Sequence, residues 1–244
     1  YLDRHPVVRR GGLRLYTHSD SCCWDHSMFD FEQARQNMVE CQIRTVRVTD
    51  AAVIEALRSV PREAFLPAHL KSIAYVDDDL RLNQDRFMME PMVMARLLQA
   101  AEIGAGDTAL AIGCTRGYAV ALLARMAETV VGVESDPDFV AASDAALSAL
   151  GVDNAAVIEG DLAQGYPRQA PYDVILIEGR CAEVPQNIVD QLAEGGRLIG
   201  VIDDHGVGKA VLMRRSGGAV GTRVLFDAQV PALKAFGRAP EFQF

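Results

Sequence analysis

Three successive apolar runs of the chain each end in residues that could bind a nucleoside: the turn Ile112–Gly117, Glu134 and Asp161. Gly113 and Gly117 flank the turn, and glycine lets a backbone approach a ligand closely and adopt positive φ. A carboxylate at Glu134 can accept two hydrogen bonds from a ribose diol, and one at Asp161 can accept from an adenine amino group. Ligands of open α/β sheets bind at the carboxyl ends of the strands, so these positions predict an adenosine site.

Two other interpretations of the same positions are open. The glycines could make tight turns and the acids could cap helices without any ligand. A nicotinamide cofactor would also use strand ends, but the G-x-G-x-x-A match, Gly104–Ala109, precedes the first strand instead of following it. The turn that does follow this strand has Thr115 in place of a middle glycine. The combination of turn, acid and acid therefore favours a nucleoside site over a dehydrogenase.

Strands and helices alternate from residue 107 onward. We expect strands at 108–112, 129–134, 155–160, 173–177 and 197–202, and helices at 117–127, 137–150 and 184–193. This alternation indicates βαβ units and a parallel sheet with both faces covered. Residues 210–228 predict two more strands joined at Ser216–Gly218, an antiparallel hairpin at the edge. Residues 100–244 thus predict an α/β domain: a Rossmann-like, doubly wound, mostly parallel sheet of about seven strands with an antiparallel edge.

The region 28–99 predicts an N-terminal helical cap. We expect its helices at 29–46, 51–60 and 90–101. Asp30 can cap the first of them with Gln33 at the capping-box position, and Pro91 stands in the first turn of the third. Residues 76–90 predict a polar loop between the second and third helices. The helical cap thus precedes the sheet domain in the chain.

Residues 1–27 differ in character from the rest of the chain. They contain the only Trp, three of the five His and the pair Cys22–Cys23, with neither helical nor strand periodicity. A signal peptide is not indicated, because no apolar core precedes a small-residue cleavage site. A metal site from His18, Cys22, Cys23 and His26 is conceivable, but this spacing matches no standard zinc pattern. We expect a flexible, non-domain leader with no metal.

The composition excludes several classes of function. Half of the 244 residues are hydrophobic and 23% are charged, which excludes general disorder, and no apolar run approaches the roughly 18 residues of a membrane span. A net charge of −9 with no basic block argues against nucleic acids and anionic membranes as partners. Five Cys without metal-ligand spacing indicate reduced thiols in a cytoplasm. The composition leaves the oligomeric state open.

Several motifs across residues 28–244 carry a family resemblance. They are Met38-Val39 with Gln42, Val60–Pro67, Ala74-Tyr75, Glu90–Ala95, Ile112–Tyr118, Gly160-Asp161, Ala170–Ile175, Gln191-Leu192 and Gly195–Leu198. In these motifs the chain resembles the protein-L-isoaspartate O-methyltransferases, a branch of the class I S-adenosylmethionine-dependent methyltransferases. The resemblance implies a cytoplasmic enzyme that uses S-adenosyl-L-methionine to esterify isoaspartyl carboxylates of damaged proteins. The predicted donor-binding residues are Gly113, Cys114, Gly117, Glu134 and Asp161.

The chain departs from the family pattern at three places. The donor motif has Ala111 and Thr115 where the family has an acid and its middle glycine. A non-glycine residue at positive φ costs about 1–2 kcal/mol, so we expect either that cost or a turn of another shape. The substrate loop reads Asp85–Met89, with Met89 where the family has a hydroxyl residue, and Glu178–Arg180 replaces Thr-Ala-Ala.

These departures leave the chemistry of a carboxyl methyltransferase possible. A carboxylate acceptor is ionised at pH 7 and needs no general base, so a lost hydroxyl removes a positioning contact and no proton transfer. Arg86 or Arg180 could replace that contact with a bidentate clamp on the acceptor carboxylate. Alternatively, Arg86 is a solvated loop residue and Met88 and Met89 pack in the core at a helix start. A degenerate member that binds donor or peptide without turnover, or that methylates another acceptor, is the second hypothesis.

Overall fold

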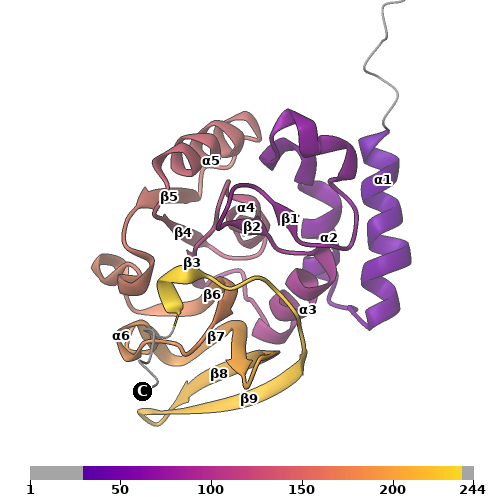
Figure 1. The fold of residues 1–244 in the computed structure, drawn as a ribbon. Helices are drawn as coiled ribbons and strands as arrows, with labels where there is room; N and C mark the ends of the chain where they lie inside the picture. The colour runs from indigo at the N-terminus through magenta and orange to yellow at the C-terminus, as the bar shows by residue number, and fades with distance from the viewer. Residues whose placement is uncertain (1–29, 238–244) are drawn as a thin grey trace, which may run out of the picture.

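The computed structural model describes residues 30–237, so the predicted leader and the His18–His26 segment lie outside the described residues. Within that range the chain forms a seven-stranded sheet with helices packed around it (Figure 1). The strands are β3 Thr108–Ile112, β4 Thr129–Glu134, β5 Ala155–Glu159, β6 Tyr172–Cys181, β7 Leu192–Asp204, β8 Val207–Ser216 and β9 Ala219–Asp227. The α/β fold class predicted from the alternating pattern is confirmed.

The strand order β5-β4-β3-β6-β7-β8-β9 places the switch in direction at β3. From β3 the chain winds outward through β4 to β5, then returns to β6 on the other side of β3. The strands from β5 to β7 pair in parallel, whereas β7, β8 and β9 pair antiparallel. The expected antiparallel hairpin at the edge is confirmed. The carboxyl ends of β3, β4 and β6 therefore meet at the switch point, where such sheets bind ligands.

Both faces of the sheet are buried because its strands alternate between two cores. Ala109 and Ala111 of β3 pack in one cluster, with helices α2 (Ala51–Ser59), α3 (Pro91–Ala101) and α4 (Tyr118–Ala124). Leu110 and Ile112 of the same strand pack in the other cluster, with α6 (Gln186–Val189). Successive side chains of a strand point to opposite faces, so an apolar run buried on both sides is the sequence pattern of such a strand.

The helical cap is shorter and less regular than the sequence predicts. Helix α1 covers Phe31–Met38, and the expected continuation to residue 46 is a π-helical turn followed by a 3₁₀ turn. Asp30 does cap α1, since its carboxylate accepts from the backbone N–H of Gln33 at 2.9 Å. The Gln33 side chain donates to Asn37 instead of completing a capping box. The π turn ends in Ile43, which is fully buried against the sheet core.

Two other expected elements differ in the structure. The predicted polar loop at 76–90 contains a short antiparallel hairpin, β1 Leu80–Arg81 with β2 Phe87–Met88. The predicted helix 184–193 is reduced to α6, because the carbonyl of Gln191 accepts from the backbone N–H of Tyr172 and the chain enters β7. On the other side of the sheet, α5 (Pro137–Ala149) matches the expected helix 137–150.

Residues 228–237, the return segment, run from the end of β9 back across the carboxyl ends of the central strands (Figure 1). Two backbone hydrogen bonds join the segment to β6. The N–H of Arg180 donates to the carbonyl of Pro231, and the N–H of Leu233 donates to the carbonyl of Arg180, each at 2.9 Å. It ends in a 3₁₀ turn, Lys234–Phe236, with Phe236 buried. Nothing in the sequence pattern predicts this course, and it places Leu233 at the switch point.

Candidate functional site

The turn after β3 has the backbone conformation of a ligand-binding glycine turn. Gly113 and Gly117 have φ of 75° and 92°, and Thr115 between them has φ of 49°. Thr115 has therefore taken the left-handed conformation at a cost of about 1–2 kcal/mol, as one of the two expected outcomes. Its carbonyl accepts from the Ser143 hydroxyl of α5 at 3.1 Å, which fixes the turn against the helix. The turn keeps its shape without the middle glycine.

Glu134 ends β4 beside this turn and is fully buried. Its Oε1 accepts from the backbone N–H groups of Ser135 and Asp136 at 2.7 and 3.1 Å. Its Oε2 accepts from the backbone N–H of Thr115 at 2.7 Å. Three backbone donors thus orient the carboxylate toward the turn, which is the position expected for a group that holds a ribose diol.

The guanidinium of Arg86, from the β1–β2 hairpin, occupies the space in front of Glu134. Nη1 and Nη2 donate to the two carboxylate oxygens of Glu134 at 2.5 and 2.6 Å, a bidentate ion pair. Nη2 also donates to the carbonyl of Gly113 at 2.7 Å. The ion pair is almost completely buried from solvent, with side-chain exposures of 10% for Arg86 and 0% for Glu134. The two oxygens that could accept from a diol are therefore already engaged by a residue 48 positions earlier in the chain.

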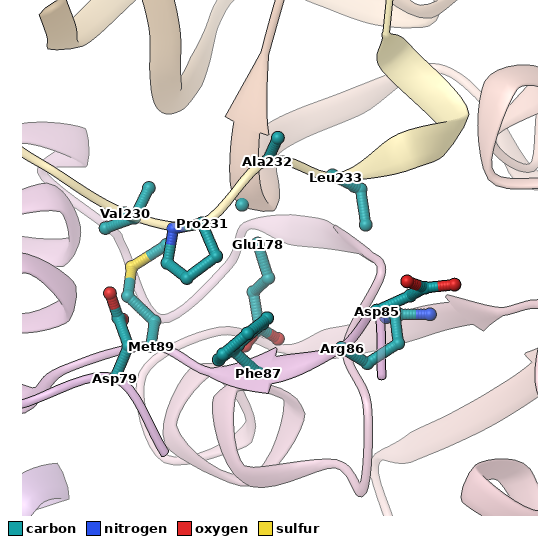
Figure 2. A pocket seen from close by; sticks show the side chains of 11 residues that line it. Asp79, Asp85, Arg86, Phe87, Met89, Glu178, Val230, Pro231, Ala232 and Leu233 are labelled. Carbon is teal, nitrogen blue, oxygen red and sulfur yellow. The ribbon is translucent and has the colours of Figure 1, made fainter. Parts of the chain in front are cut away.

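A small cavity lies on the inner side of Arg86, between the hairpin, the end of β6 and the return segment (Figure 2). Its volume is about 20 Å³. The side chains that shape it include Asp79, Phe87, Met89, Glu178, Pro231 and Leu233. A single water needs roughly 10–15 Å³ on this measure, so the cavity has room for about one water and not for an amino-acid side chain.

Glu178 extends from β6 into this cavity, where one of its carboxylate oxygens, Oε1, is buried and has no hydrogen-bond partner among the described residues. Burial raises the pKa of Glu178 to about 8; the positive charges of Arg86 and Arg62 oppose this shift, and the charge of Glu134 adds to it. At neutral pH the group is therefore largely protonated, and a carboxylic acid can donate a hydrogen bond as well as accept one.

A larger hollow of about 480 Å³ lies on the outer side of Arg86. The hairpin loop, the residues after β4, Leu162 after β5 and the 3₁₀ turn of the return segment line it. Its volume is within the range of small-molecule sites. Asp161 does not line this hollow; its carboxylate caps the 3₁₀ turn at Leu162 through the N–H of Ala163 at 2.9 Å. The cap uses one of about four acceptor sites of the carboxylate, so Asp161 keeps capacity to accept from an adenine amino group.

Two further predicted site residues, Cys114 and Arg180, have other hydrogen-bond or ion-pair partners than Glu134. Cys114 is buried, and its Sγ lies 3.8 Å from the Val133 carbonyl, directed into the sheet. Arg180 lines a separate hollow of about 410 Å³ with Asp203 and lies 4.0 Å from that carboxylate. The structure therefore does not bring Arg180 into the cavity that Arg86 borders, and Arg86 has both terminal nitrogens engaged. A clamp on an acceptor carboxylate stays a prediction for both.

Met89 lies in the wall of the small cavity. Its side chain is buried, and its carbonyl accepts from Nη2 of Arg62 at 2.8 Å. Arg62 is itself fully buried, donates to Ala74 and lies over the Tyr118 ring. Through Arg62, the Val-Pro-Arg-Glu stretch thus holds the end of the substrate loop in place.

Leu233 was missed at the site because it follows β9 in a stretch without periodicity.

The described part of the chain contains neither a metal cluster nor a membrane span. Residues 30–237 include no group of three His, Cys, Asp or Glu side chains placed to hold a metal ion. None of the helices in the same range combines the length and apolar character required to cross a bilayer.

Comparisons with known proteins identify one family. A family model described as protein-L-isoaspartate(D-aspartate) O-methyltransferase matches residues 33–231. Protein-L-isoaspartate O-methyltransferase from Methanoculleus marisnigri is 37% identical over 204 residues, covering 83% of this chain and 93% of the relative. Protein-L-isoaspartate O-methyltransferase 1 from Rhodopseudomonas palustris is 38% identical over 169 residues, 69% of each chain.

Two solved structures share the fold. A protein-L-isoaspartate O-methyltransferase structure superimposes with a TM-score of 0.73 at 26% identity, covering 81% of this chain and 65% of that one. A Plasmodium falciparum structure in complex with S-adenosyl-L-homocysteine superimposes with a TM-score of 0.71 at 22% identity, covering 84% and 98%.

Proposed function

This chain belongs to the protein-L-isoaspartate(D-aspartate) O-methyltransferase family, and we propose that it methylates the free carboxylate of isoaspartyl residues in damaged proteins. The observation that carries this proposal is the family match over residues 33–231, which spans the glycine turn, the substrate loop and the end of β6. The resemblance seen in the sequence motifs is thereby confirmed. We further propose that its partners are peptides or proteins and that it works in the cytoplasm.

The backbone turn and the carboxylate at the switch point are suited to bind the family's methyl donor, S-adenosyl-L-methionine. Gly113 and Gly117 present backbone at positive φ, Glu134 is oriented by three N–H groups, and the outer hollow has the volume for an adenosine. Ribose contact at Glu134 requires that Arg86 first leave that carboxylate. When bound there, the donor would supply a methyl group on a sulfonium; this chain would supply orientation and a site shielded from water.

The acceptor side can work without a general base. An isoaspartyl carboxylate is already the nucleophile at neutral pH, so the site has to align it and exclude water. Protonated Glu178 is placed to donate a hydrogen bond into the inner cavity, where the family pattern has hydroxyl side chains. Met89 and Phe87 supply an apolar wall on the same side (Figure 2).

A second candidate function is a family member that binds donor or peptide without isoaspartyl turnover. The specific observation that favours it is the Arg86–Glu134 ion pair together with an inner cavity of only about 20 Å³. In this alternative the closed site is the permanent state of the molecule.

A methyl-transfer assay separates the two candidates. The full chain is incubated with labelled S-adenosylmethionine and a pair of peptides of identical sequence, one with isoaspartate and one with aspartate. The proposed function predicts base-labile methyl ester on the isoaspartyl peptide and background on the aspartyl peptide. Equal background on both peptides contradicts isoaspartyl methylation, and a panel of other carboxylates then tests for a different acceptor.

A further inference from the structure

We propose that Arg86 is an internal competitor of the methyl donor: it closes the donor site by pairing with Glu134, and the donor binds only after this ion pair has opened. The inference rests on the proposed donor site and goes beyond it, because it assigns to one side chain of the substrate loop control over donor affinity.

The hydrogen bonds of Glu134 leave little capacity for a ligand while Arg86 is in place. Oε1 accepts from Arg86, Ser135 and Asp136, and Oε2 accepts from Arg86 and Thr115. A carboxylate offers about four lone-pair sites, so five donors within 3.1 Å saturate it. A ribose diol and the guanidinium would compete for the same two oxygens.

Sterics at the turn point to the same conclusion. A Cβ built on Gly113 would lie 3.1 Å from Cδ2 of Leu233 and 3.3 Å from Nη2 of Arg86. The close approach that glycine permits is thus used by two of the protein's own side chains, one from the hairpin and one from the return segment. A ligand that needs this approach has to displace them.

The loop that carries Arg86, residues 82–86, lies outside the core, whereas Leu80 and Met88 in the flanking strands are buried in the core and hold the hairpin itself in place. Strands β1 and β2 have two residues each and pair only with one another in the described structure. The loop between them is held by surface contacts, from Asp85 to Lys234 and from Asn83 to Asp136. The Arg86 side chain is the deep anchor of this loop, so the ion pair and the loop would open together.

Opening exchanges a buried ion pair for ligand contacts, and its cost appears in the measured affinity. A ligand that binds one of two states has an affinity lowered by the fraction of molecules in the competent state. Replacing Arg86 by Ala removes the competitor and leaves Glu134 with its three backbone donors. We expect Arg86→Ala to bind S-adenosylhomocysteine at least tenfold more tightly than the wild type.

Isothermal titration with S-adenosylhomocysteine tests this on the full chain. Arg86→Lys keeps the charge but cannot bridge both oxygens of Glu134, so we expect an intermediate affinity. Leu233→Ala opens the second obstruction and should raise affinity about threefold. If Arg86→Ala is poorly folded, the Lys and Leu233 variants carry the same comparison.

Arg81→Ala is the matched control, because Arg81 lies in the same hairpin and donates to the carbonyls of Asn83 and Gln84 without reaching Glu134. It should bind like the wild type, and an equal gain in Arg81→Ala would show that loosening the loop is sufficient and overturn the role of Arg86. Tight wild-type binding that Arg86→Ala leaves equal or weakens overturns the inference while the proposed function stands. No binding by any variant overturns both.

Discussion

The two sides of the switch point are built in different ways. On one side, the turn after β3 and the residues after β4 supply Gly113, Thr115, Glu134 and the backbone donors around them from within 24 positions of chain. On the other side, the substrate loop and the return segment bring Arg86 and Leu233 together from positions 147 residues apart in the chain. The first side presents the framework that we propose for the donor, and the second side covers it.

This difference shows that a family's binding framework can persist while the segments over it change. The carboxylate geometry of Glu134 depends on backbone N–H groups, which substitutions leave in place. The residues that cover it depend on side-chain identity in a loop, where Arg86 and Met89 replace the family's polar loop. Membership of the family is therefore compatible with an ion pair that covers the carboxylate of Glu134.

The largest effect should follow from breaking the ion pair on its buried acidic side. Glu134→Ala leaves the buried guanidinium of Arg86 without a counter-charge and with only the Gly113 carbonyl as a hydrogen-bond partner, and the loss of one side of a buried ion pair costs about 3–5 kcal/mol. Arg86→Ala should cost less, because Glu134 keeps three backbone donors. Urea unfolding followed by circular dichroism measures both. Glu159→Ala, at the exposed position that pairs with Glu134 on β5, is the control and should lie within about 0.5 kcal/mol of the wild type. A smaller loss for Glu134→Ala than for Arg86→Ala would contradict this account of the pair.

A second prediction uses the pH dependence of the cavity side. Glu178 has a pKa of about 8 when folded, against an ordinary value of 4.5, so between these values the folded state holds a proton that the unfolded state has released. Stability should therefore fall as pH rises from about 4.5 to 8, by at most about 1.4 kcal/mol per pH unit. Glu178→Gln removes this pH dependence, so the stability of the variant relative to the wild type should increase from about pH 4.5 to 8.

Melting temperatures of both proteins from pH 5 to 8.5 measure this relative stability. Asp79→Asn is the comparison. Burial raises the pKa of Asp79 only to about 6, so the contribution of Asp79 to the pH dependence of stability should end near pH 6. Parallel curves for the wild type and Glu178→Gln would show that Glu178 is ionised when folded and would remove its role as a hydrogen-bond donor.

The smallest expected effect concerns the framework side. Thr115→Gly should stabilise the protein by about 1 kcal/mol, because it relieves left-handed strain of roughly 1–2 kcal/mol and removes a buried hydroxyl without a partner, against a smaller entropic cost of glycine. A rise of roughly 2–4 °C in Tm would match this gain. Thr108→Gly, in β3 at ordinary φ, should instead lower Tm. A lower Tm for Thr115→Gly would mean that contacts of the threonine outweigh its strain.

The sequence predicted the fold of the framework side well because its signals are local. Strand periodicity, the flanking glycines and the acid at the end of β4 lie next to one another in the chain, and each has a direct structural meaning. The covering side could not be predicted in the same way. From its residue type, Arg86 was a candidate for a clamp on the acceptor carboxylate. In the structure it pairs with Glu134, which is 48 positions away, and this choice of carboxylate depends on tertiary packing. Leu233 gave no signal, since its position follows from the path of the return segment.

A crystal structure of the wild-type chain with S-adenosylhomocysteine tests the central claim most directly. The quantity to read is the distance between Nη1 of Arg86 and Oε1 of Glu134, which is 2.5 Å in the closed site. The account predicts that this ion pair is broken in the complex, with the ribose hydroxyls within hydrogen-bond distance of both Glu134 oxygens and Arg86 displaced together with the loop between β1 and β2. S-adenosylhomocysteine bound over Gly113–Gly117 while Arg86 still bridges both oxygens of Glu134 would contradict it.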